Sequence, residues 1–180
     1  MANVASFRSK SIANPRPLPD AMHDVLLEIH QLDLTDVFDF AMLVPTVAWI
    51  LISPEPVFVF AHVLTAWGIT NFMRSTTMAV TSLPDPRNGC EFVESDLLTT
   101  FTLHRCGDCI FSGHTIIFVI SALVWTTLGH VIQIVFAVAM WLLAIVAALV
   151  VLANRAHYTV DVLLSFYITV ANWYAVSALW

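Results

Sequence analysis

Residues 130–152 read HVIQIVFAVAMWLLAIVAALVVL, an apolar run without a charged side chain. A helix needs about 20 mostly apolar residues to cross the hydrocarbon core of a bilayer, and in lipid the helix also satisfies its own backbone amides. This run therefore predicts a membrane-spanning helix. Four further segments approach the same length and composition, at about residues 37–53, 57–73, 110–128 and 158–180.

The overall composition also indicates a lipid-embedded chain. Of the 180 residues, 59% are hydrophobic and 11% are charged, whereas soluble domains lie nearer to half apolar and a quarter charged. The seven Lys and Arg residues are scattered singly and the net charge is −6, which excludes the basic patch that nucleic-acid binding requires. We predict an all-α membrane protein, a polytopic helical bundle of about five transmembrane helices.

The polar segment before the first span contains an amphipathic pattern. From Asp20 to Leu34, apolar residues recur every three to four positions and polar or acidic residues occupy the other side. This pattern predicts an interfacial helix with Asp20 as its N-cap. We therefore divide the chain into an N-terminal segment with this helix, residues 1–36, and a transmembrane domain, residues 37–180.

Five spans place the connecting segments alternately on two sides of the membrane. The N-terminal segment, residues 74–109 and residues 153–157 share one side, which we call the histidine side because His114 and His157 lie at span ends there. Every Lys and Arg also falls on the histidine side. The connection 74–109 spaces Val93, Leu97 and Phe101 one helical turn apart, so we expect a second interfacial element in it.

His157 and Asp161 lie four positions apart in the sequence HYTVD. On a helix they would share one face, where the carboxylate can orient the imidazole and stabilise its protonated form. Ionisable groups at the start of a span usually face a polar cavity. The pair taken alone is explained equally well by solvation among lipid headgroups, so both interpretations stay open.

A second candidate motif is Ser112-Gly113-His114-Thr115, at the start of the third span. Small residues at a helix N-terminus expose backbone N–H groups, and these bind phosphate together with the helix dipole. The motif alone also describes an ordinary helix cap, but it shares the histidine side with His157. The candidate phosphate-binding residues are Arg74, Ser112, Gly113 and Arg155, and Arg105 is a further candidate. For the arginines the alternative is snorkelling to lipid headgroups.

The three cysteines, Cys90, Cys106 and Cys109, are too few for a disulfide framework or a four-ligand zinc site. A redox role for the Cys106–Cys109 pair would need a thioredoxin-like βαβ pattern, which the sequence lacks. A Cys90–Cys106 disulfide stays open and would require an oxidising lumen. His62 lies inside a span, where we expect it to be a packing residue.

Four stretches of the chain form an ordered set of motifs. They are PLPD at residues 17–20, RSTTMAVTSLPDP at 74–86, CGDCIFSGHT at 106–115 and HYTVDVLLSFYIT at 157–169. This set resembles the sphingomyelin synthase and inositol phosphorylceramide synthase family, relatives of the type-2 phosphatidic acid phosphatases. The phosphatases have proline before SGH, where this chain has Phe111, and arginine six before the second histidine, where it has Val151. The resemblance is therefore to the synthases.

The resemblance implies transfer of a phosphorylated headgroup from a glycerophospholipid to ceramide, with release of diacylglycerol. His114, His157 and Asp161 occupy the catalytic positions of the family. In the scheme that this implies, His157 attacks phosphorus and forms a phosphohistidine, Asp161 orients it, and His114 exchanges protons with the two lipid oxygens. No cofactor and no metal are expected. The alternatives are a lipid phosphate phosphatase that uses water as acceptor and a non-catalytic ceramide-binding membrane protein.

The resemblance leaves three properties open. Members of the family usually have six spans, with one before PLPD, so this chain is either a short five-span version or truncated. The positive-inside rule would place the histidine side in the cytosol, whereas the resemblance implies a luminal or exoplasmic active site in the Golgi or plasma membrane, which we follow. The headgroup, whether phosphocholine, phosphoethanolamine or phosphoinositol, and the oligomeric state are not readable from the sequence.

Overall fold

The computed structural model describes residues 17–81, 83–87, 110–127 and 131–179, and these form helices without a strand. The helices are α2 (Ala21–Val25), α3 (Leu32–Ile52), α4 (Pro56–Val80), α5 (Gly113–Thr127), α6 (Val131–Ala153) and α7 (Thr159–Leu179). By length and composition α3, α4, α6 and α7 can cross a membrane, and α5 is a shorter apolar helix. The five predicted spans correspond to α3–α7, and the all-α polytopic membrane fold is confirmed.

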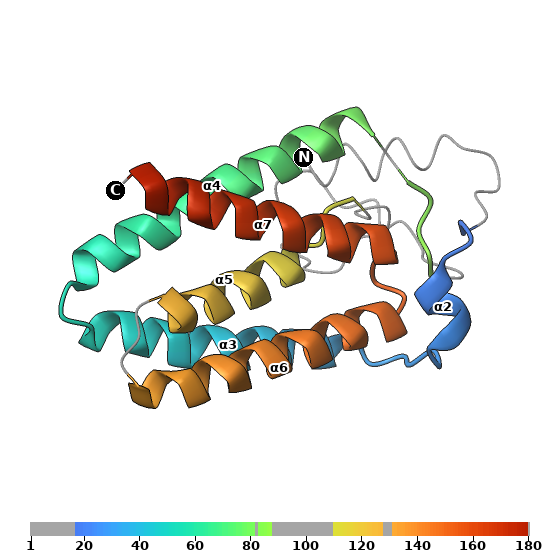
Figure 1. The fold of residues 1–180 in the computed structure, drawn as a ribbon. Helices are drawn as coiled ribbons and strands as arrows, with labels where there is room; N and C mark the ends of the chain where they lie inside the picture. Colours follow the sequence, from blue (N-terminus) through green and yellow to red (C-terminus); the bar gives the residue numbers. More distant parts are fainter. Residues whose placement is uncertain (1–16, 82, 88–109, 128–130, 180) are drawn as a thin grey trace, which may run out of the picture.

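The helices alternate in direction, as hairpin counting on the sequence predicted. Figure 1 shows α2 beside the start of α7 at one end of the bundle, and the tight α3–α4 turn at the opposite end. Among the described residues, the histidine side therefore holds the starts of α3, α5 and α7 and the ends of α4 and α6. The two histidines are brought to the same end of the bundle by chain topology alone.

Helix α5 is the centre of the bundle. It packs against α3, α4, α6 and α7, and nearly every residue from Thr115 to Trp125 is buried. A helix buried on all sides needs apolar residues all round, which is why its sequence shows no polar face. Alanines on α5 and α6, including Ala122 and Ala147, are fully buried and allow the two backbones to approach closely.

Hydrogen bonds between side chains join neighbouring helices inside the bundle. Trp125 Nε1 on α5 donates to Thr46 Oγ1 on α3 at 3.1 Å, and Asn172 Nδ2 on α7 donates to Thr70 Oγ1 on α4 at 3.0 Å. Such bonds add modest stability in lipid and fix the rotation of one helix against another. The outer faces of α3, α4, α6 and α7 carry exposed large apolar side chains such as Phe72, which suit contact with lipid tails.

The helical segments differ from the sequence predictions at the N-terminus. The interfacial helix predicted over Asp20–Leu34 is limited to α2, and α3 starts at Leu32, five residues before the predicted span. After Leu26 the chain turns extended, and the backbone N–H of Ile29 donates to the carbonyl of Ala153 at 2.9 Å. The polar backbone groups of this segment thus bond to the end of α6, which ends the short helix.

Helix α4 also continues beyond its predicted end at Met73, so Arg74 lies inside the helix rather than after it. Asp20 is the N-cap of α2, as predicted. The second interfacial element, the three cysteines and Arg105 lie outside the described residues.

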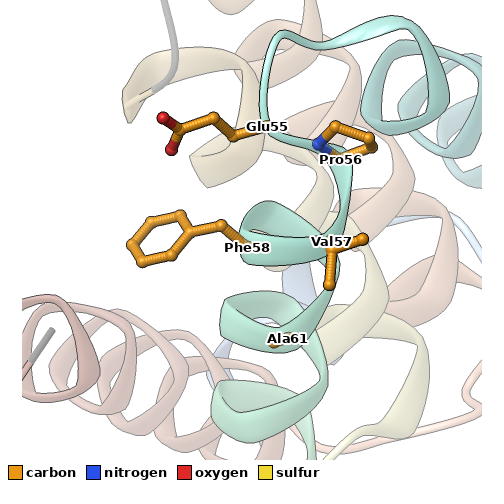
Figure 2. A pocket seen from close by; sticks show the side chains of 5 residues that line it. All are labelled: Glu55, Pro56, Val57, Phe58 and Ala61. Atoms are coloured by element: carbon orange, nitrogen blue, oxygen red, sulfur yellow. The ribbon is translucent and has the colours of Figure 1, made fainter.

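Two surface hollows lie at the end of the bundle opposite His114 and His157. One, at the α3–α4 turn, has a volume of about 570 Å³. Figure 2 shows that the Glu55 and Phe58 side chains, which line it, extend from the backbone in the same direction. The second, of about 310 Å³, is lined by residues that include His62, Trp173 and Ser177. His62 is buried there against Trp173, with ring centroids 4.5 Å apart, so the prediction of a packing role is confirmed.

Candidate active site

His157 lies in the short connection between α6 and α7. This connection begins with a Schellman turn, in which the Ala156 N–H donates to the Val151 carbonyl at 3.2 Å and Arg155 takes the left-handed position with φ of 54°. Because α7 begins at Thr159, His157 precedes the helix instead of sharing its first turn with Asp161. The helical spacing inferred from the sequence was wrong at this point.

Asp161 nevertheless lies beside His157. Its Oδ2 accepts a hydrogen bond from the backbone N–H of Tyr158 at 2.9 Å, the reciprocal contact of a capping box. The same oxygen lies 3.9 Å from His157 Nδ1. Both side chains are buried, with exposed fractions of 8% and 3%. The predicted proximity is confirmed, and the cap at the start of α7 is what brings the carboxylate to the imidazole.

His114 occupies the first turn of α5 and has a carboxylate partner that the sequence analysis did not identify. Its Nδ1 lies 2.6 Å from Oδ2 of Asp39 on α3, and both side chains are mostly buried. When Nδ1–H donates to a carboxylate, Nε2 is left to exchange a proton with a reacting group. Asp39 therefore fixes the ring position and tautomer that acid–base chemistry at His114 needs.

The two imidazoles stand close to each other. The ring centroids of His114 and His157 are 6.4 Å apart, and their planes meet at 69°. Reacting atoms in a productive complex lie about 3–3.5 Å apart, so one phosphoryl group between the rings can approach both. Each histidine has a carboxylate near its Nδ1 atom, Asp39 at His114 and Asp161 at His157.

The side chain of Arg74, on α4, lies beside the start of α5, where its predicted phosphate-binding role would place it. Its Nε donates to the backbone carbonyl of Phe111 at 2.7 Å, and its guanidinium carbon lies 3.6 Å from where a Cβ on Gly113 would stand. Phe111 is fully buried and has φ of 69°, a left-handed conformation that a bulky side chain rarely adopts. This strained residue turns its carbonyl toward Arg74 and so anchors the arginine beside the SGH motif.

The other two predicted phosphate-binding side chains make contacts with the protein. Ser112 is buried, and its Oγ accepts a hydrogen bond from the Thr115 N–H at 3.3 Å, so it is an N-cap of α5. Arg155 Nη2 donates to the carbonyls of His23 and Leu26 at 2.5 and 3.2 Å and so holds the end of α2. The helix cap was one of the two interpretations of the Ser112 motif, whereas the contacts of Arg155 with the end of α2 were not foreseen. The contact of either residue with phosphate stays a prediction.

One group of side chains at the site has the donors of a cation site. One donor atom each from Asp36, Asp39 and His114 lies within 4.8 Å of the others. Two carboxylates and an imidazole fit a divalent cation, but Nδ1 of His114 already bonds to Asp39 at 2.6 Å. A cation would have to replace that contact, so the geometry favours the direct His114–Asp39 contact over a metal.

A known protein family matches the segment that carries most of these residues. The PAP2 superfamily C-terminal model matches residues 105–178, which include His114, His157 and Asp161. The chain is 32% identical over 142 residues to a phosphatidylethanolamine:ceramide ethanolaminephosphotransferase of Trypanosoma brucei brucei, covering 73% of this chain and 41% of that protein. The chain thus resembles the sphingolipid synthases and contains a segment similar to the PAP2 superfamily C-terminal region.

Two further relatives of this chain carry a different headgroup in their names. The chain is 34% identical over 119 residues to a phosphatidylinositol:ceramide inositolphosphotransferase of Trypanosoma cruzi, covering 60% of this chain and 36% of that protein. A protein of the same name from Oryza sativa subsp. indica is 30% identical over 126 residues, covering 62% and 38%. The chain thus spans about two fifths of the length of these relatives.

Asp39 is the residue of the candidate site that sequence reasoning missed. It lies 75 residues before His114, outside the segment matched by the superfamily model. One signal was present, because Asp33, Asp36 and Asp39 are three residues apart at the start of an apolar helix. Carboxylates within a membrane span are costly and usually serve a function.

Proposed function

We propose that this protein transfers a phosphorylated headgroup from a glycerophospholipid to ceramide and releases diacylglycerol. The observation that supports it best is the pair of histidines with ring centroids 6.4 Å apart, each with its own carboxylate nearby. The names of the relatives support ceramide as the acceptor and phosphatidylethanolamine or phosphatidylinositol as the donor.

In the first half of the proposed reaction, Nε2 of His157 attacks the phosphorus of the donor lipid. The bond from phosphorus to the diacylglycerol oxygen breaks, and His114 donates the proton that converts this oxygen to a hydroxyl. Asp161 lies 3.9 Å from His157 Nδ1 and stabilises the positive charge that the imidazole gains on phosphorylation. Diacylglycerol then leaves, and a phosphohistidine remains on the protein.

In the second half, ceramide takes the place of diacylglycerol. His114, now neutral, accepts the proton of the ceramide hydroxyl, and this oxygen attacks the phosphorus as the bond to His157 breaks. Arg74 at Gly113 and the N-terminal end of the α5 dipole stabilise the negative oxygens in both steps. Ser112 shapes this helix start by capping it.

The proposed function has a direct test. The protein, purified in detergent, is given fluorescent ceramide with phosphatidylethanolamine, phosphatidylinositol or phosphatidylcholine, and the lipid products are separated by chromatography. A new polar sphingolipid and an equal amount of diacylglycerol are expected with at least one donor. Release of phosphate or a free phosphorylated headgroup without ceramide would instead identify a phosphatase. Binding of ceramide without any product would leave only a ceramide-binding role.

We expect Asp39→Asn to lower the transfer rate by about tenfold to a hundredfold, because the amide no longer holds His114 in one tautomer. The rate is measured as polar sphingolipid formed per folded protein. Asp33→Asn is a matched control, since Asp33 lies on the same helix and is exposed. An unchanged rate in Asp39→Asn would remove the positioning role from this carboxylate.

We expect transfer to persist after metal removal, because the imidazoles and arginine perform every proposed step. The assay is repeated after dialysis against EDTA, and then with Zn²⁺ added. Added Zn²⁺ should inhibit if it displaces the Asp39–His114 contact at the three donors that include Asp36. A rate that EDTA abolishes and Mg²⁺ or Mn²⁺ restores would contradict the proposed chemistry.

We further propose that the histidine side faces the lumen or the exterior, in the Golgi or plasma membrane. The positive-inside rule opposes this placement, but two of the arginines on that side have contacts within the fold. Arg74 bonds to Phe111, and Arg155 bonds to the end of α2. Their presence on this side has a structural reason, so they weigh less as signals of orientation.

A further inference from the structure

The segment from Leu18 to Gln31 lies alongside the connection that carries His157, although that connection comes about 130 residues later in the chain. Hydrogen bonds join Gln31, the last residue of the first segment, to Asn154, near the start of the second. The Gln31 N–H donates to Asn154 Oδ1 at 2.8 Å, and Asn154 Nδ2 donates back to the Gln31 carbonyl at 3.1 Å. Figure 1 shows the result, with α2 beside the start of α7. The PLPD motif, residues 17–20, forms the other end of this segment and contacts Tyr158 and Thr159. It takes no part in the proposed transfer reaction.

Asp20, the last residue of PLPD, caps two helices with one carboxylate. Its Oδ1 accepts hydrogen bonds from the backbone N–H groups of Met22 and His23, both at 3.1 Å, at the start of α2. Its Oδ2 accepts from the backbone N–H of Thr159, the first residue of α7, at 2.7 Å, and Thr159 Oγ1 donates to Oδ1 at 2.5 Å. Tyr158 precedes α7 and has no short polar side chain, so Asp20 supplies this cap from the N-terminal segment.

The charge of Asp20 strengthens both caps. Its partial burial acts to raise the pKa of the carboxyl, but the hydrogen bonds from Thr159 and His23 outweigh this and lower the pKa below its usual value. Asp20 is therefore ionised at neutral pH, and ionised acceptors form the stronger hydrogen bonds to helix N–H groups.

The same segment holds the two residues before Thr159. Nε2 of His23 donates to the backbone carbonyl of His157 at 3.0 Å. The N–H of Leu18 donates to the Tyr158 hydroxyl at 3.0 Å, and this hydroxyl donates to the Pro84 carbonyl at 2.9 Å. Three consecutive residues that begin with His157 are thus each held by the segment around Asp20.

We propose that Asp20 is a positioning residue for His157. Its carboxylate orients α2 and the start of α7 together, and His23, which it caps, then holds the backbone of His157 at the distance from His114 that phosphoryl transfer needs. The inference rests on the proposed function for its catalytic consequence, whereas the contact itself is independent of the reaction. A shift of about 1 Å in a reacting group is enough to reduce a rate by roughly a hundredfold.

The test compares Asp20→Ala with Asp20→Asn and with Asp24→Ala, a matched control because Asp24 is exposed on the same helix. For Asp20→Ala we expect kcat per folded protein to fall between about tenfold and a hundredfold, with KM for both lipids within about twofold. Asp20→Asn keeps one acceptor oxygen, so its kcat should fall between Asp20→Ala and the unchanged protein. Asp24→Ala should not change kcat. A lowered folded fraction with a normal kcat in the folded part would overturn the proposal, since it would indicate a structural role alone.

A second measurement does not depend on activity. In Asp20→Ala, hydrogen–deuterium exchange should increase in the peptide spanning residues 157–162. In Thr159→Val the increase in the same peptide should be small, because the backbone N–H of residue 159 still donates to Asp20. If the unchanged protein transfers no headgroup, the proposed function fails while the exchange result still decides whether Asp20 holds this segment. Unchanged exchange in Asp20→Ala would overturn the inference even if transfer is observed.

Discussion

His157→Ala should reduce headgroup transfer to the background of a protein-free reaction, because it removes the atom that bonds to phosphorus. A general acid can be partly replaced by water, but a covalent intermediate cannot form without its nucleophile. The expected result is no polar sphingolipid and no diacylglycerol above background with any donor. The measurement is lipid chromatography at matched amounts of folded protein.

The covalent step can be observed separately in the unchanged protein. With a donor labelled in its headgroup and no ceramide, label should accumulate on the protein in an acid-labile form and map to His157 by mass spectrometry. His157→Ala should carry no label. His30→Ala is a suitable control, since the His30 side chain is 85% exposed. Label that persists in His157→Ala, or that maps to another residue, would refute the assigned nucleophile.

His114→Ala should lower transfer by between about a hundredfold and ten thousandfold, the usual contribution of a positioned acid or base. The loss has a distinctive dependence on the leaving group. Diacylglycerol leaves as an alcohol and needs a proton, whereas a nitrophenyl ester of the same headgroup releases a stable phenolate. With the nitrophenyl donor, His114→Ala should therefore recover much of the first half-reaction, measured as release of nitrophenol, and His157→Ala should recover none.

The comparison of the two variants decides the roles. If His114→Ala is equally inactive with the nitrophenyl donor, then His114 does more than protonate the leaving oxygen. If instead His157→Ala recovers activity with this donor and His114→Ala does not, the roles of the histidines are exchanged. The ring geometry alone, 6.4 Å between centroids, does not distinguish these assignments. Both histidines have a carboxylate nearby, at 2.6 Å from His114 and 3.9 Å from His157, so the nitrophenyl comparison is the experiment that assigns the roles.

The sequence was sufficient to predict the bundle and one half of the site. Apolar run lengths correspond to α3–α7, because backbone amides in lipid leave the chain few alternatives to a helix. Alternating spans then place His114 and His157 at one end, whatever the details of packing. The limits of the N-terminal helix were predicted less well. Periodicity suggested a helix to Leu34, but hydrogen bonds to the end of α6 stop it at Val25, and such distant partners leave no periodic signal.

The other half of the site depends on contacts between segments far apart in the chain. Asp39 meets His114 only because α3 packs against α5, and Asp20 meets Thr159 only because α2 lies on the start of α7. A single sequence contains no record of which acidic residue faces which histidine. The polar residues at the start of α3 and in PLPD marked these segments as unusual, but their partners required the folded chain.

The shortness of α5 has a consequence for how rates should be measured. Fifteen residues of helix extend only about 22 Å, against about 30 Å for the hydrocarbon core, and α3, α4, α6 and α7 pack against α5. If the far end of α5 lies near the opposite surface, its histidine end lies below the level of the headgroups. Lipids would then reach the histidines sideways from the surrounding leaflet. Velocity should accordingly follow the mole fraction of donor lipid in a mixed micelle, and diluting all lipid and detergent together in buffer should leave it unchanged.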